Sequence, residues 1–196
     1  MSHLIALEGL DQSGKQTQAE RLVEALKERG RRVELLSFPD YKTYIGMEIE
    51  KALHHEREYD PDVMQLLYIA NRYEYRPKIE ELLARQFVVV CDRYLASSIA
   101  YGEAFGLDPE WLAGAQKYLP QPSLTIVLDI APAASLSRKK LDRDRYERDL
   151  ALLERVRASY QRQARHASWQ LIDGTRDKDA VTEDIMDAVR ARLGLL

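Results

Sequence analysis

One stretch near the start of the chain constrains its fold more than any other. Residues 4–7 are apolar, the run Gly9-Leu10-Asp11-Gln12-Ser13-Gly14-Lys15 follows them, and apolar residues then recur at helical spacing from about residue 16 to residue 29. This order predicts a buried strand, a loop and a helix. In such a loop, backbone N–H groups and the helix N-terminus face phosphate oxygens, and the lysine reaches the β and γ phosphates. A plain glycine-rich turn is the alternative interpretation.

The phosphate-binding interpretation predicts a nucleotide ligand, which we expect to be ATP. We expect the ATP-binding residues to be Gly9, Leu10, Asp11, Gln12, Ser13, Gly14, Lys15, Gln16 and Thr17. A GTPase switch is disfavoured, because the sequence has no Asn-Lys-x-Asp motif for reading guanine.

Short apolar runs alternate with longer amphipathic ones along the rest of the chain. We expect further strands at residues 33–38, 87–91, 124–128 and 169–172, and helices at 63–75, 77–85, 150–167 and 179–193. Asp60-Pro61 is typical of a helix start, with Asp as the N-cap and Pro in the first turn. Strands alternating with helices predict an α/β fold, a parallel five-stranded sheet with helices on both faces, in one domain spanning residues 1–196. Ligands of such sheets bind beyond the carboxyl ends of the strands.

Composition limits the partners and the compartment. The 196 residues carry a net charge of -3 with a pI near 5.9, which disfavours a nucleic-acid polymer as partner. No apolar run reaches membrane-spanning length, and the N-terminus lacks the pattern of a signal peptide. The single cysteine, Cys91, lies in an apolar run, which favours a core position over a nucleophile. We therefore expect a cytoplasmic protein.

Two positions are candidates for a Mg²⁺ site. Gln16 follows Lys15, where the phosphate-loop motif has Ser or Thr, and its amide oxygen is a hard ligand that can bind Mg²⁺ directly or through water. Asp92 follows the third predicted strand in Asp92-Arg93-Tyr94, where a carboxylate can hold Mg²⁺ through water and an arginine can clamp phosphate oxygens. A surface turn with a salt bridge is the alternative for these three residues.

Several stretches, in this order and spacing, resemble the thymidylate kinase (dTMP kinase) family of P-loop nucleoside-monophosphate kinases nearly end to end. They are Glu8-Gly9-Leu10-Asp11 through Lys15, Phe38-Pro39 with Thr43 and Gly46, Leu66-Leu67-Tyr68-Ile69-Ala70-Asn71-Arg72, Asp92-Arg93-Tyr94 with Ser97 and Ala100-Tyr101, Leu124-Thr125-Ile126-Val127-Leu128-Asp129, Asp144-Arg145-Tyr146-Glu147, Val156-Arg157 with Tyr160, and Trp169-Gln170-Leu171-Ile172-Asp173. The resemblance implies a P-loop NTPase architecture, the reaction dTMP + ATP giving dTDP + ADP, and a homodimer.

The resemblance also implies a role for individual residues of the acceptor site. Tyr68 matches an aromatic that stacks on thymine, Arg72 an arginine that bonds a base carbonyl, and Tyr101 an aromatic against the deoxyribose. From the helical pattern alone, Tyr68 reads as a core aromatic. The implied dTMP-binding residues are Asp11, Phe38, Lys42, Tyr68, Arg72, Arg93, Ser97 and Tyr101.

A basic segment after the fourth predicted strand matches the mobile lid of the family, at about residues 137–148. Position 12 is Gln and not Arg, so the resemblance assigns the catalytic arginine to the lid, without ranking its candidates. A charged, solvated face is the plainer interpretation of such a run. The expected catalytic residues are Lys15, Arg93, Arg138, Arg143 and Arg145.

The chain departs from the family pattern at four places. Gln16 replaces a hydroxyl residue, the stretch Asp40-Tyr41-Lys42 lacks an arginine for the acceptor phosphate, Gly102 stands where many bacterial members have a Gln, and Ser123 where Asp is usual. The alternatives are a related kinase for another deoxynucleotide or a deoxynucleoside, and a nucleotide-binding regulatory protein with impaired catalysis. Arg93 disfavours a neutral deoxynucleoside, because its charge would then lack a partner.

Overall fold

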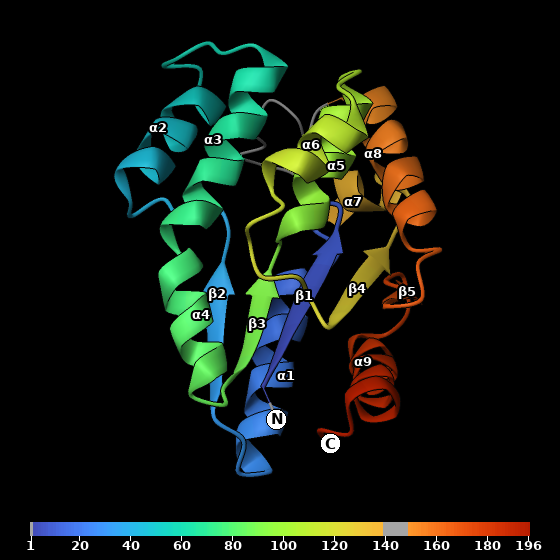
Figure 1. The fold of residues 1–196 in the computed structure, drawn as a ribbon. Coiled ribbons are helices and arrows are strands. Elements are labelled where there is room, and N and C mark those ends of the chain that lie inside the picture. Colours follow the sequence, from blue (N-terminus) through green and yellow to red (C-terminus); the bar gives the residue numbers. More distant parts are fainter. Residues whose placement is uncertain (1, 139–148) are drawn as a thin grey trace.

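The centre of the molecule is a parallel β-sheet. The computed structural model describes residues 2–138 and 149–196, and in this part of the chain the strands are β1 His3–Gly9, β2 Val33–Ser37, β3 Val88–Asp92, β4 Leu124–Asp129 and β5 Trp169–Asp173. Their spatial order is β2-β3-β1-β4-β5, and every neighbouring pair runs parallel. The predicted five-stranded parallel sheet is confirmed (Figure 1).

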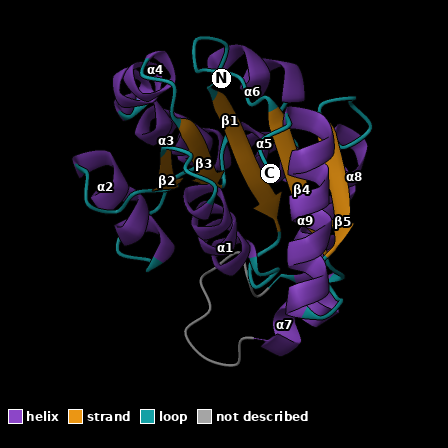
Figure 2. Ribbon diagram, turned by 90° about the horizontal axis from the view of Figure 1, so that it is seen from below, coloured by secondary structure: helices purple, strands orange, loops and turns teal. Residues whose placement is uncertain are grey.

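Helices cover both faces of this sheet (Figure 2). One face packs against α1 Lys15–Glu28 and α9 Lys178–Leu193. The other packs against α4 Arg76–Ala84, α5 Leu95–Ala104 and α8 Leu150–Gln163. The remaining described helices, α2 Tyr44–Leu53, α3 Pro61–Glu74, α6 Pro109–Ala115 and α7 Pro132–Arg138, lie around the carboxyl ends of the strands.

The two-sided burial explains why the strands read as continuous apolar runs. In β1, Ile5 and Leu7 belong to the core shared with α1 and α9, whereas Leu4 and Ala6 belong to the core on the opposite face. All four are almost fully buried. A strand buried on both faces has no polar side, which is typical of parallel sheets.

Some predicted boundaries differ from the structure. The helix predicted at 150–167 ends at Gln163, because the amides of Arg165 and His166 bond three residues back and turn the chain toward β5. The third strand begins at Val88, since the N–H of Phe87 donates to Leu82 O and closes α4. Asp60 does occupy the N-cap of α3, but within the described part of the chain its side chain accepts no capping hydrogen bond.

Within residues 2–138 and 149–196, no helix is both long and apolar enough to cross a membrane.

Candidate active site

The loop between β1 and α1 has the backbone of a phosphate cradle. Gly9 has φ 136° and Gly14 has φ 96°, and a Cβ at Gly9 would lie 2.5 Å from Leu128 O. Glycine is therefore required at position 9, both for conformation and for space. Gly14 caps α1, so the N-terminus of that helix points at the loop.

Lys15 is held inside this loop. Its Nζ donates to Leu10 O at 2.7 Å, and the side chain is buried. Burial, followed by the nearby charge of Arg93, lowers the pKa of Lys15 to about 8. The ammonium is thus poorly solvated, which strengthens its attraction for an anion.

A charged pair closes one end of the neighbouring cavity. Arg93 forms an ion pair with Asp11, its Nη1 donates to Gly9 O at 3.1 Å, and Tyr101 OH donates to Asp11 Oδ2 at 3.1 Å. Burial opposes ionisation of Asp11, but the charges of Arg93 and Lys15 lower its pKa to about 2. The ion pair therefore joins the P-loop to the residue that follows β3, and the Arg93 guanidinium that it fixes lines the cavity.

The cavity itself lies beyond the carboxyl ends of β1 and β3, between α3 and α5. Its volume is about 90 Å³, and its lining residues are Asp11, Phe38, Pro39, Tyr41, Leu53, Gln65, Tyr68, Arg72, Arg93, Ser97, Ser98 and Tyr101. Every predicted acceptor-site residue except Lys42 is among them. Lys42 is exposed, and its neighbour Tyr41 lines the cavity instead.

The sequence and the fold of this chain are similar to those of known proteins. The family model "Thymidylate kinase" matches residues 7–185. The chain belongs to the thymidylate kinase family.

Relatives and a solved structure agree with the family match. The chain is 38% identical over 159 residues to the thymidylate kinase of Schizosaccharomyces pombe, covering 81% of this chain and 75% of that one. It is 36% identical over 196 residues to the human thymidylate kinase, covering 95% and 91%. Its fold matches the structure of thymidylate kinase from Candida albicans with a TM-score of 0.82 and 27% identity, covering 100% and 94%.

The two arginines that line the cavity, Arg72 and Arg93, lie at different ends of it. Arg93 contacts the P-loop, whereas Arg72 of α3 donates through Nη1 to Ser98 Oγ at 2.7 Å and to Gln116 Oε1 at 3.5 Å. Arg72 is buried, and burial lowers its pKa. The cavity thus has one cation at its phosphate-loop end and another against α5 and α6.

Asn71 and Tyr75 fix the segment that follows β2. Asn71 accepts from Asp40 N at 2.8 Å and donates to Thr43 Oγ1 at 2.9 Å, while Tyr75 OH donates to Asp40. That hydrogen bond raises the pKa of Tyr75 to about 12. Phe38 packs edge-on against Tyr75, with ring centroids 5.3 Å apart. These contacts hold Phe38 and Tyr41 in the cavity wall.

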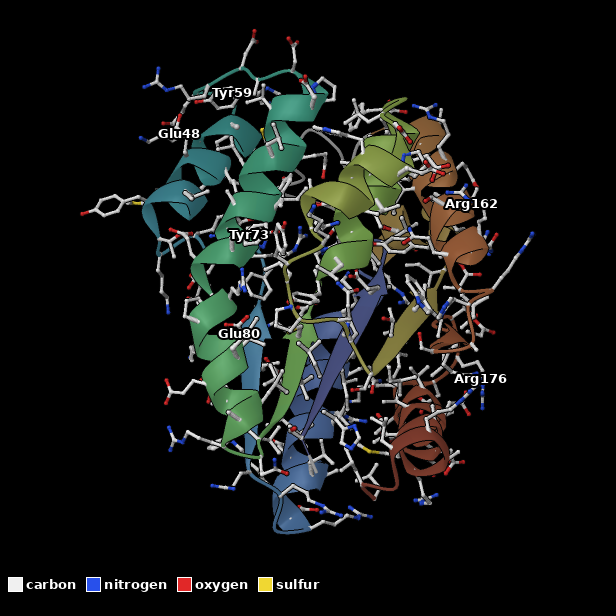
Figure 3. All side chains as sticks on the ribbon, in the orientation of Figure 1. Glu48, Tyr59, Tyr73, Glu80, Arg162 and Arg176 are labelled. Atoms are coloured by element: carbon white, nitrogen blue, oxygen red, sulfur yellow. The ribbon has the colours of Figure 1, made fainter. Side chains whose placement is uncertain are left out.

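Hydrogen bonds join α3 to α6 and α2 to the loop that precedes α3. Tyr73 of α3, labelled in Figure 3, donates to Ala115 O at 2.9 Å at the end of α6. Tyr59, at the top of the same view, donates to Glu48 of α2 at 2.6 Å. Of these two contacts, the one from Tyr73 joins helices that are 42 residues apart in sequence, at Tyr73 and Ala115.

Glu8 is a buried residue that the sequence interpretation did not assign to the site. Its Oε1 accepts from Tyr94 N at 2.8 Å and Ser97 N at 3.3 Å, and its Oε2 from Ser97 Oγ at 2.6 Å and Tyr160 OH at 3.1 Å. Arg93 Nη1 in turn donates to Ser97 Oγ at 3.2 Å. Glu8 thus orients the groups behind Arg93. A carboxylate directly after the apolar run 4–7, before the phosphate loop, was the available signal.

On the donor side, the described part of the predicted lid is Ser137 and Arg138. Arg138 Nη1 donates to Gln12 O and Nη2 donates to Gly174 O, both at 3.0 Å. It therefore joins the P-loop to the segment after β5. Arg143 and Arg145 lie outside the described residues.

The two predicted metal ligands have different environments. Asp92 ends β3, its Oδ1 is buried without a hydrogen-bond partner among the described residues, and burial raises its pKa. An unpaired buried carboxylate oxygen fits a site for a cation or a cation-bound water. Gln16 is exposed on α1, and its Nε2 donates to Glu20 Oε1 at 3.1 Å. Of these two residues, only Asp92 has a buried side-chain oxygen that no described residue bonds.

Proposed function

We propose that the chain transfers the γ-phosphoryl group of ATP to dTMP, giving dTDP and ADP. The observation that carries the proposal is the acceptor cavity next to the P-loop, with Arg93 and Asp11 at its phosphate-loop end and aromatic side chains along its walls. Membership in the thymidylate kinase family supports the same substrates.

Arg93 is proposed to bind the acceptor phosphate. Its guanidinium is fixed by Asp11, Gly9 O and Ser97, so its remaining N–H donors are oriented before the substrate arrives. Asp11 is proposed to lie near the acceptor phosphate and the 3′-hydroxyl. Tyr101, held by its bond to Asp11, is proposed to pack against the deoxyribose, where it disfavours a 2′-hydroxyl.

Tyr68 and Arg72 are proposed to bind the base. Both lie on the same face of α3 and line the cavity. A flat aromatic side chain suits stacking on a planar ring, and a buried guanidinium suits a ring carbonyl.

The donor site is proposed to consist of the loop Gly9–Thr17, with Lys15 on the β and γ phosphates. Phosphoryl transfer depends mainly on positioning and charge stabilisation. Bound Mg²⁺ would neutralise charge on the transferred group, and Asp92 is the residue proposed to hold it. Arg138 is proposed to brace the P-loop, because it binds Gln12 O and Gly174 O. Family membership supports three further proposals. The first is a lid at about 137–148 that includes Arg143 and Arg145; the others are a homodimer and a cytoplasmic location.

The function is tested by following ADP formation with ATP and Mg²⁺. The acceptors are dTMP, dUMP, dGMP and thymidine, each offered alone. We expect the highest kcat/KM with dTMP and little turnover of thymidine, since Arg93 would face no phosphate. Absence of turnover with dTMP above the blank would refute the proposal.

A further inference from the structure

Ser135 of α7 is a buried serine that bonds the backbone of the P-loop. Its Oγ donates to Asp11 O at 2.7 Å, and its exposed fraction is 4%. The two residues are 124 positions apart in the chain, so only the tertiary structure brings this hydroxyl to the loop. Arg138, three residues further along α7, donates to the next carbonyl, Gln12 O, at 3.0 Å. Helix α7 therefore holds two successive carbonyl groups of the P-loop.

The carbonyl group before these two is held as well. Leu10 O accepts from Lys15 Nζ at 2.7 Å and from Ser13 N at 3.2 Å. A carbonyl oxygen carries partial negative charge, so it would repel a phosphate that it faced. Donors bound to three successive oxygens of the loop keep them away from an anion and leave amide groups to face it.

The hydrogen bond from Ser135 sets the orientation of one particular peptide group. The peptide between Asp11 and Gln12 is trans, and in a trans peptide the C=O and the following N–H point in opposite directions. Because Asp11 O points to α7, Gln12 N–H points away from α7. No described residue accepts a hydrogen bond from this N–H. It is therefore available to a ligand in the loop.

This peptide orientation needs support from outside the loop. Gln12 has φ 61°, a left-handed conformation that is strained in a residue other than glycine. Reversal of the peptide between Asp11 and Gln12 would return this φ to the ordinary negative range. The same reversal would turn the Asp11 carbonyl toward the phosphate position and Gln12 N–H away from it. The bond from Ser135 opposes that reversal, because Asp11 O would lose its donor.

We infer that Ser135 is a positioning residue of the donor site: its hydroxyl orients the Asp11–Gln12 peptide so that Gln12 N–H donates to an oxygen of the β phosphate. The inference rests on the proposed function, which assigns the donor nucleotide to the P-loop. The carboxylate of Asp11 is held separately, by Arg93 and Tyr101. Loss of the Ser135 hydroxyl should therefore weaken binding at the donor site and leave the acceptor site nearly unchanged.

The test is Ser135→Ala in the full-length chain, with ADP and Mg²⁺ as the donor-site probe and dTMP as the acceptor-site probe. Alanine is the best helix former, and circular dichroism checks that the variant is folded. We expect the calorimetric Kd for ADP to rise about 3- to 10-fold, the effect of one hydrogen bond, and that for dTMP to change less than about 2-fold. The KM for ATP should rise by a similar factor, with the KM for dTMP constant.

Ser159→Ala is the matched control. Ser159 has a similar exposed fraction, 2%, and lies in α8, where its Oγ donates to Glu103 Oε2 of α5 at 2.7 Å. This variant also loses one buried hydroxyl group, but none that bonds the P-loop. It should keep the wild-type Kd for both ADP and dTMP.

The outcomes separate this inference from the proposed function. An unchanged Kd for ADP in Ser135→Ala overturns the role of Ser135, and so does an equal rise in the Kd for dTMP, which would indicate a general loss of structure. A wild type that binds ADP but phosphorylates no acceptor overturns the proposed function and leaves the ADP comparison intact. If Ser135→Ala does not fold, Ser135→Cys, which keeps only a weak S–H donor, takes its place. Its Kd for ADP should exceed the wild-type value, and equality overturns the inference.

Discussion

The ionisation of Lys15 links its burial to nucleotide binding. Because its pKa is lowered to about 8, the ammonium is charged at pH 7 and loses its proton as the pH rises toward 9. Bound phosphates favour the charged form, so ATP binding should take up a proton above pH 8. We expect the affinity for ATP to fall between pH 7 and pH 9, measured by calorimetry in buffers of different ionisation enthalpy.

Lys15→Arg provides the control for this pH dependence. Arginine stays protonated throughout this range, so the affinity of the variant should be nearly flat from pH 7 to pH 9. An equally steep decline in the variant would show that another group is responsible.

Glu8 supports Arg93 but is not among the residues that line the cavity. In Glu8→Gln the amide nitrogen cannot accept, so one end of the network is left unpaired. We expect a loss of about 1–3 kcal/mol in the free energy of unfolding, measured with urea. The KM for dTMP should rise as well, because Ser97 and Tyr160 would hold Arg93 less firmly.

Tyr160→Phe is the milder companion variant. It removes only the hydroxyl that donates to Glu8, so its effect on stability should be smaller, about 1 kcal/mol. Equal stability of Glu8→Gln and the wild type would contradict the role given to this carboxylate.

At the scale of elements, the contact between α2 and the segment after β2 shapes the acceptor cavity. A Cβ at Gly46 would lie 1.8 Å from Asp40 O, which is part of the backbone that carries Phe38 and Tyr41 into the cavity wall. Gly46→Ala should therefore cost more than about 2 kcal/mol in unfolding free energy and raise the KM for dTMP. Urea unfolding and steady-state kinetics measure the two effects.

Gly114→Ala in α6 is the matched control for this substitution. A Cβ there would meet no atom of residues 2–138 or 149–196 within 4 Å, and the residue lies in a helix. This variant should gain about 0.5–1 kcal/mol from the higher helix propensity of alanine, with unchanged kinetics. A stable and fully active Gly46→Ala would show that the cavity wall tolerates displacement of the segment.

At the scale of the whole molecule, substrate binding should stabilise the fold as a unit, since the cavity joins β1, β3, α3 and α5. At 100 times its Kd, dTMP should add about 2.7 kcal/mol. For a chain of this length that raises Tm by about 5–11 °C. Thymidine at the same concentration should give a much smaller shift, because the Arg93 guanidinium would gain no phosphate partner. Differential scanning fluorimetry measures both, and equal shifts would argue against Arg93 as the phosphate anchor.

The sequence by itself predicted the five strands, five of the described helices and the phosphate loop. These features depend on local periodicity and on glycines with positive φ, such as Gly9 and Gly14. Both can be recognised from a few consecutive residues. The family resemblance further placed Tyr68, Arg72 and Arg93 in one site, and all three line the acceptor cavity.

The tertiary structure decided what periodicity cannot distinguish. Glu8 and Gln65 lie in buried positions of a strand and a helix. Only their neighbours across the fold give the Glu8 carboxylate four donors, and among the described residues they leave Gln65 Oε1 without one. Likewise, only the tertiary structure shows that Tyr41, and not Lys42, lines the cavity. It also shows that Arg138 donates to two backbone carbonyls, those of Gln12 and Gly174. Local pattern determines which residues are buried, whereas partners contributed by distant segments determine what a buried polar group does.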